Sequence, residues 1–322
     1  MLQVYPELPV KEGVEDAPEN ISRRQLTGIV CYLFGLFMRI FLDLGKFHLG
    51  EYLSKQPALV RMLGGLVYTG VYAFSGVAFW RGIWHLMIQD VGEKTTQLIV
   101  VLIGSLLVLL FSKVSRSLIS SPLALCLDTH ANTFANTSYF KRSPEAKGWF
   151  VVDVIFTNLV VRQLIVFCWW SLWSLENSFL INNQIGERDR YVSYDSVLMG
   201  YAAATLAYTL DKLIMKSTST KQYITKPLQY LVTVIAFFGS VNVWRGVWSV
   251  YDNFLFPGIG KELNYLVSLS VGFLVLSVML LSNTICSDHI ASDFDEGEIV
   301  NIKYWEKKKV DSDSDEMIPI VE

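Results

Sequence analysis

Seven long, predominantly apolar segments divide this sequence, and each is long enough to cross a lipid bilayer as a helix. A transmembrane helix needs about 20 such residues, because every backbone N–H and C=O group must be bonded inside the hydrocarbon. The pattern therefore predicts an all-α fold, a polytopic transmembrane helical bundle of seven spans. The segments lie at about 26–46, 62–89, 96–118, 149–180, 194–215, 225–254 and 263–285.

The polar residues between these segments form no block large enough to fold independently. Only 18% of the residues are charged, whereas soluble domains carry about 25%. We expect one transmembrane domain over 26–285, preceded by an acidic N-terminal tail at 1–25 and followed by an acidic cytoplasmic tail at 286–322. No basic patch with interleaved aromatic residues suggests nucleic acid, so the lipid bilayer is the first expected partner.

The distribution of lysine and arginine predicts the orientation of the bundle. With seven spans and an outside N-terminus, the inward segments carry 16 lysine and arginine residues and the outward segments carry 7. Cytoplasmic loops are enriched in these residues, so a cytoplasmic C-terminus is expected. An alternative of eight spans adds residues 117–135, a poor span because it contains Pro122, Asp128 and His130.

A five-residue phrase recurs in the apolar segments, which indicates an internally repeated architecture. Residues 80–84 read Trp-Arg-Gly-Ile-Trp, residues 244–248 read Trp-Arg-Gly-Val-Trp, and residues 169–173 are a degenerate copy. Each copy is followed by a short loop and another apolar segment. The sequence thus predicts three tandem helical hairpins near 62–118, 149–215 and 225–285.

The phrases supply most of the candidate structural or ligand-facing residues. Tryptophans near span ends usually lie at the headgroup level, and this interpretation suits Trp84, Trp173 and Trp248. A fixed Trp-Arg-Gly order instead favours a motif inside the bundle, where the glycine admits a neighbouring helix. Both interpretations stay open for Trp80, Arg81, Gly82, Trp84, Trp169, Trp173, Trp244, Arg245, Gly246 and Trp248.

Arg162 lies near the middle of its apolar segment. A charge at that depth costs about 3 kcal/mol or more without a partner, so we expect Arg162 to face the interior and pair with another helix. Arg39 and Asp43 can pair on one helix face. The buried arginines Arg81, Arg162 and Arg245 then either lock the helices together or form an anion site, which requires two of them to face one void.

Nothing in the sequence indicates catalysis. The histidines have no metal-ligand spacing, and there is no phosphate-binding loop or nucleophile elbow. We therefore expect a protein that is not an enzyme and that binds no cofactor or metal. Cys126 and Cys286 lie beyond span ends, where they are candidates for acylation. Ser312 and Ser314 in the acidic tail are candidate phosphorylation sites.

The phrases at 79–84 and 242–253, with the acidic serine-bearing tail, resemble the Fuseless family of multi-pass membrane proteins of invertebrate animals. That family is described with eight spans, where the hydropathy predicts seven. The resemblance implies a presynaptic plasma-membrane protein that supports neurotransmitter release. It implies no known catalytic activity and assigns no binding residue.

Three functions follow as hypotheses. The first is a non-enzymatic membrane protein that organises or assists other membrane proteins, such as ion channels or release machinery. The second is a transporter or channel for small solutes or anions, with a site among the buried arginines, since many transporters are built from repeats. The third is a seven-span receptor, although the sequence has no receptor-type Asp-Arg-Tyr motif.

Overall fold

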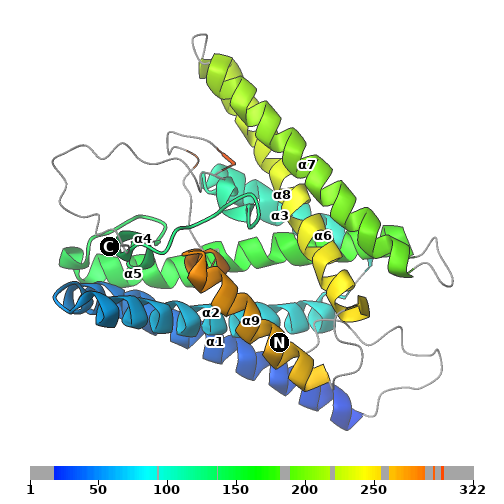
Figure 1. The fold of residues 1–322 in the computed structure, drawn as a ribbon. Coiled ribbons are helices and arrows are strands. Elements are labelled where there is room, and N and C mark those ends of the chain that lie inside the picture. Colours follow the sequence, from blue (N-terminus) through cyan, green and yellow to red (C-terminus); the bar gives the residue numbers. More distant parts are fainter. Residues whose placement is uncertain are drawn as a thin grey trace.

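The computed structural model describes residues 18–92, 94–135, 137–181, 189–217, 222–254, 261–286, 293 and 299–300. Over these residues the regular structure is helical, as expected (Figure 1). The helices are α1 (Pro18–Ser54), α2 (Ala58–Asp90), α3 (Thr95–Phe111), α4 (His130–Thr133), α5 (Gly148–Phe156), α6 (Arg162–Ile181), α7 (Asp189–Ser217), α8 (Gln222–Phe254) and α9 (Lys261–Val278). Short 3-10 turns lie at Ser115–Leu118, Pro144–Ala146 and Ser282–Cys286.

Three helix pairs have the most extensive contacts: α1 with α2, α7 with α8, and α3 with α6. Figure 1 shows α1, α2 and the α5–α6 rod running side by side, with the α7–α8 pair inclined across them and α9 crossing α2 obliquely. The tandem hairpins expected at 62–118, 149–215 and 225–285 are not confirmed. The predicted hairpins pair α2 with α3, α6 with α7 and α8 with α9. The extensive packing instead pairs α2 with α1, α3 with α6 and α8 with α7.

Glycines explain why two of these pairs pack so closely. A Cβ atom on Gly35 or Gly82 would lie 2.3 Å from the backbone nitrogen of Phe79 or Tyr32, respectively, across the α1–α2 interface. A Cβ atom on Gly200 would lie 2.5 Å from the Val243 nitrogen across the α7–α8 interface. Small residues let helices approach closely in a membrane, so these glycines fix the two pairings.

Four helical segments are long and apolar enough to cross a membrane: Gln25–Ser54, Ala58–Asp90, Gly148–Phe179 and Lys226–Val250. Two shorter apolar helices cover Thr95–Phe111 and Leu266–Val278. The seven expected spans are therefore not confirmed. The difference has a local cause in α7, where Asp195, Asp211 and Lys212 lower the hydropathy of a 29-residue helix.

The expected helix at 96–118 ends early. The α-helix stops at Phe111, and Lys113 has a φ of 58°. This left-handed conformation turns the chain sharply away from the helix axis. The apolar residues that follow, such as Leu118 and Ile119, are buried in a segment that contains a 3-10 turn but no α-helix.

We call residues 113–128 the re-entrant segment. Its first part contacts successive positions along α8, and its end contacts a different part of the bundle. The Lys113 ammonium donates to the Tyr230 hydroxyl, and the backbone of Ser120 bonds to the Ser240 hydroxyl. These α8 partners are ten residues apart, about 15 Å along a helix. Asp128, at the end of the segment, instead contacts the turn after α9.

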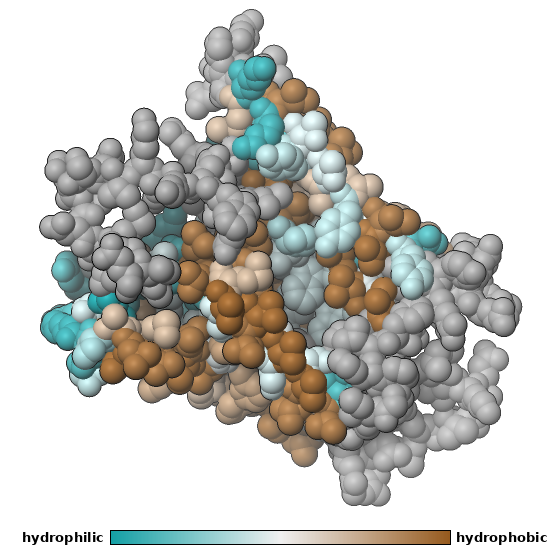
Figure 2. Space-filling model, viewed as in Figure 1, coloured by the Kyte–Doolittle hydropathy of each residue, from teal (hydrophilic) through white to brown (hydrophobic). Residues whose placement is uncertain are grey.

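Many large apolar side chains remain exposed on the outside of the bundle. Phe37, Phe41 and Phe74 are 64%, 71% and 63% exposed, respectively. Figure 2 shows a broad apolar surface over the part of the molecule formed by α1, α2 and α9. Apolar surface on this scale is untypical of a soluble monomer and fits contact with lipid.

Candidate functional site

A buried polar cluster joins α1, α2 and α6 at Arg162. The Arg162 Nη1 atom lies 2.7 Å from Oδ2 of Asp43, and its Nη2 atom donates to the Tyr72 hydroxyl at 2.7 Å. Asn158 donates to the same Asp43 oxygen at 3.0 Å. Arg162, Asp43 and Asn158 are all buried. The sequence-based prediction that Arg162 faces the interior and pairs with another helix is confirmed.

Two further cations of α1 lie in the same cluster, one beside Asp43 and one over Tyr72. The Lys46 Nζ atom lies 3.7 Å from Oδ1 of Asp43 and donates to the Thr137 hydroxyl at 3.1 Å. The guanidinium of Arg39 lies over the Tyr72 ring, 4.7 Å from its centroid. The Asp43 carboxylate thus pairs with both Arg162 and Lys46. Arg39 adds a cation–π contact with the Tyr72 ring.

The backbone is irregular where this cluster forms. Residues Thr157–Val161 form a π-helical turn between α5 and α6, so that Asn158 and Arg162 point at Asp43. One turn earlier, the buried Asp153 carboxylate accepts hydrogen bonds from the Ser138 hydroxyl and from the backbone N–H groups of Phe140 and Arg142. Single π turns often occur at functional sites.

A small cavity of about 40 Å³ adjoins the cluster. Its volume suits a single water molecule. Asp43 and Lys46 contribute to its wall, but Arg81, Arg162 and Arg245 are not among its lining residues. The other lining residues are Tyr68, Thr69, Tyr72, Asn132, Thr133, Ala135, Thr137, Asn283 and Cys286.

A second buried ion pair lies between α6 and α8. The Arg245 Nη1 atom is 3.6 Å from Oε2 of Glu176, and its Nε atom donates to the Asn177 side chain at 2.9 Å. Asn242 donates to the other Glu176 oxygen at 2.7 Å. Glu176 lies 14 residues beyond Arg162 on α6, about 21 Å along the helix. Arg162 and Arg245 therefore pair with separate carboxylates.

The tryptophans of the first two phrases meet in matching register. The rings of Trp80 and Trp169 are 5.5 Å apart, and those of Trp84 and Trp173 are 5.7 Å apart, both in edge-to-face geometry. Trp84 is buried, so it packs inside the bundle rather than in a lipid-facing belt. Trp80 and Trp169 thus lie at the same level of the bundle.

The second and third phrases hold the re-entrant segment. The Trp169 indole N–H donates to the Leu118 carbonyl at 3.2 Å, and the Trp244 indole N–H donates to the Ser121 carbonyl at 2.8 Å. Backbone carbonyls that are buried away from water need hydrogen-bond donors within the protein. These indoles provide such bonds.

Of the remaining predicted residues, Arg81 and Gly82 lie on α2, and Gly246 and Trp248 lie on α8. Arg81 and Trp248 are half-buried, whereas Gly82 and Gly246 are buried. Ser312 and Ser314 lie outside the described residues.

Burial lowers the reactivity of two thiols beyond the spanning helices. Burial, with a smaller effect of the nearby Asp128, raises the pKa of Cys126 to about 11. Burial raises the pKa of Cys286 to about 12. At neutral pH both thiols are protonated, which disfavours the acylation considered for them, because the thiolate is the nucleophile.

The apolar helices and the buried polar contacts between them define an all-helical membrane protein. The model of the family described as Fuseless matches residues 21–286, most of the chain. The protein belongs to the Fuseless family, as the resemblance predicted. Neither the curated proteins nor the solved structures contain a match.

Proposed function

We propose that this protein is a non-enzymatic membrane protein that organises or assists other membrane proteins and supports presynaptic neurotransmitter release. The observation that carries the proposal is the mutual pairing of buried charges, Arg162 with Asp43 and Arg245 with Glu176. Paired charges hold helices in register, whereas a transport site needs charges that face a solute. A rigid bundle with small loops suits a scaffold.

The proposal places seven spans in the plasma membrane with a cytoplasmic C-terminus. The extensive packing of α7 against α8 supports a span at α7. Helix α8 contains an apolar segment long enough to cross the membrane, Lys226–Val250. If α8 crosses the bilayer, α7 crosses beside it. The lysine and arginine distribution supports the orientation, and family membership supports the synaptic role.

The partner-facing surface includes residues of the part of the chain that connects α3 to α6 in the sequence. Phe140 and Trp149 are 52% and 71% exposed, and exposed aromatic residues are frequent anchors of interfaces. Photo-crosslinking amino acids placed at 140 and 149 in neuronal membranes test the proposal. Recovery of a channel or release-machinery protein is the expected result. Crosslinks to lipid alone at both positions, with the same amino acid at lipid-facing position 74 as control, would contradict it.

The re-entrant segment favours transport of a small solute as a second candidate. Non-helical backbone inside a membrane domain often lines a permeation path, and the polar cavity lies near its end at Asn132 and Thr133. Flux of small anions into liposomes that contain the purified protein tests this function. Uptake above that of protein-free liposomes, lost on Lys46→Met, would favour transport over the scaffold role.

A further inference from the structure

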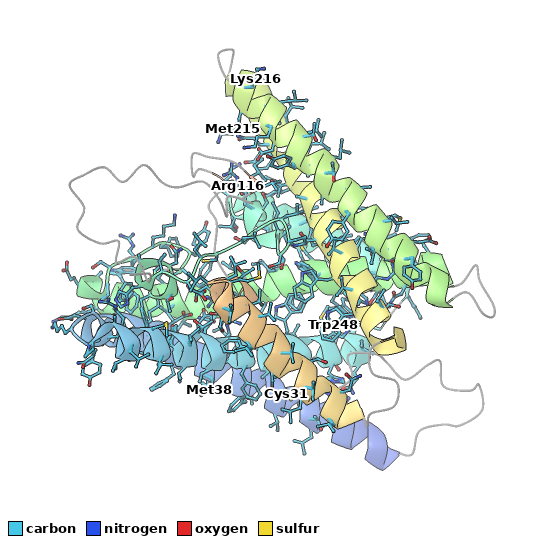
Figure 3. All side chains as sticks on the ribbon, viewed as in Figure 1. Cys31, Met38, Arg116, Met215, Lys216 and Trp248 are labelled. Atoms are coloured by element: carbon cyan, nitrogen blue, oxygen red, sulfur yellow. The ribbon has the colours of Figure 1, made fainter. Side chains whose placement is uncertain are left out.

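Three residues well beyond α9, namely Asp293, Ile299 and Val300, are buried against the bundle. Asp293 is 5% exposed, Ile299 is 6% exposed and Val300 is fully buried. Their contacts come from α7, α8 and the re-entrant segment, none of which is adjacent to them in sequence. Figure 3 labels Met215 and Lys216 near the end of α7, with Arg116 below them in the view.

The first anchor is Asp293. Its carboxylate accepts hydrogen bonds from the Ser115 backbone N–H at 3.1 Å, the Ser115 hydroxyl at 2.8 Å and the Arg116 backbone N–H at 3.0 Å. The Asp293 N–H donates to the Lys113 carbonyl at 2.7 Å, and the Lys226 ammonium donates to the Asp293 carbonyl at 3.3 Å. Both the side chain and the backbone of this residue are therefore recognised.

The second anchor is the pair Ile299 and Val300. Their consecutive backbone N–H groups donate to one oxygen of the buried Asp211 carboxylate on α7, at 2.8 and 3.0 Å. Hydrogen bonds to an ionised acceptor are about twice as strong as those between neutral groups. The two residues belong to an apolar cluster that also contains Ile119, Leu123, Ala204, Ala207, Ile214, Val232 and Ala236.

Another peptide with the same few groups could make these contacts. The socket binds one acidic side chain, two adjacent backbone N–H groups and two aliphatic side chains. Short peptides are commonly recognised through such backbone hydrogen bonds and side-chain pockets. Alanines at 204, 207 and 236 leave room for the aliphatic pair because they have short side chains. The surrounding elements, α7, α8 and the re-entrant segment, therefore form a socket for such a peptide.

We propose that this socket is a peptide-binding site, which the chain's own Asp293, Ile299 and Val300 occupy. Its ligand class is a peptide with an acidic residue followed, six residues later, by two adjacent aliphatic residues. The tethered segment has a local concentration on the order of millimolar, so it excludes a weaker peptide until it is released. A cytoplasmic peptide of a partner protein is the competitor; that identity rests on the proposed function.

The test uses the full-length protein in detergent and a fluorescent peptide of residues 291–302, measured by fluorescence anisotropy. Val300→Asp places a charge in the apolar cluster and releases the chain's own segment. We expect the peptide to bind this variant at least tenfold more tightly than the wild type. A matched peptide that is N-methylated at Val300 lacks one of the two N–H donors to Asp211, and we expect it to bind at least tenfold more weakly.

Asp293→Ala provides an independent release, because it removes the three hydrogen bonds to the Asp293 carboxylate and leaves the apolar cluster unchanged. Thermal unfolding identifies which variants are folded. Peptide binding to a folded release variant, with the loss on N-methylation, supports the proposal. Equal affinity for wild type and variants, or no binding to either folded variant, would overturn it. No partner protein is present, so the outcome is independent of the role in neurotransmitter release.

Discussion

The Nη1 atom of Arg162 and the Oδ2 atom of Asp43 lie 2.7 Å apart, although their residues are 119 positions apart in the sequence. Both side chains are buried. This contact ties the π turn before α6 to α1, and Tyr72 extends the connection to α2. We regard the pair as the central lock of the bundle, and the Glu176–Arg245 pair as its counterpart between α6 and α8.

Replacing Gly82 at the α1–α2 interface by alanine is expected to lower the stability of the protein. Gly82→Ala brings a Cβ atom to within 2.3 Å of the Tyr32 backbone nitrogen, so the helices must separate. We expect a cost of about 1–3 kcal/mol and a lower midpoint of thermal unfolding in detergent. Gly104→Ala is the control, since no atom lies within 4 Å of its added carbon. Equal midpoints for the two variants would refute this explanation of the packing.

The tryptophans of the second and third phrases are expected to stabilise the re-entrant segment. Trp169→Phe or Trp244→Phe leaves the Leu118 or Ser121 carbonyl without its indole donor. An unpaired buried polar group costs about 1–3 kcal/mol. Hydrogen–deuterium exchange should therefore accelerate over residues 115–121. Trp149→Phe, at a side chain that is 71% exposed, should leave this exchange unchanged. Unchanged exchange in all three variants would show that the indoles do not hold the segment.

The thiols of Cys126 and Cys286 are expected to react slowly at neutral pH. Because burial raises their pKa to about 11 and about 12, the reactive thiolate increases about tenfold for each pH unit up to those values. Maleimide labelling followed by mass spectrometry at pH 7, 8 and 9 measures this trend in the folded protein. Complete labelling of either residue within minutes at pH 7 would contradict the assigned environment.

Much of the fold was predictable because hydropathy reports which segments contact lipid. The all-helical class and the burial of Arg162 are supported by the structure. The partner of Arg162 was not predicted, since no local spacing links positions 43 and 162. Asp43 was instead assigned to Arg39, four residues away on the same helix.

The re-entrant segment was missed for a different physical reason. Residues 112–121 contain no glycine or proline to mark the end of α3, and apolar residues continue through Leu118 and Ile119. Those side chains are apolar because they pack against Trp169 and other core residues rather than against lipid. Hydropathy cannot distinguish these two environments. The tryptophan phrases were recognised, but their indole contacts depend on that unpredicted backbone.

A double-mutant cycle on Asp43 and Arg162 tests the central lock most directly, with free energies of unfolding measured for Asp43→Asn, Arg162→Gln and the double variant. Each single change should cost about 3–5 kcal/mol, because it leaves a buried charge without its main partner. The double change should cost less than the two single costs combined, by about 1–3 kcal/mol. Additive costs, or single variants as stable as the wild type, would contradict the account.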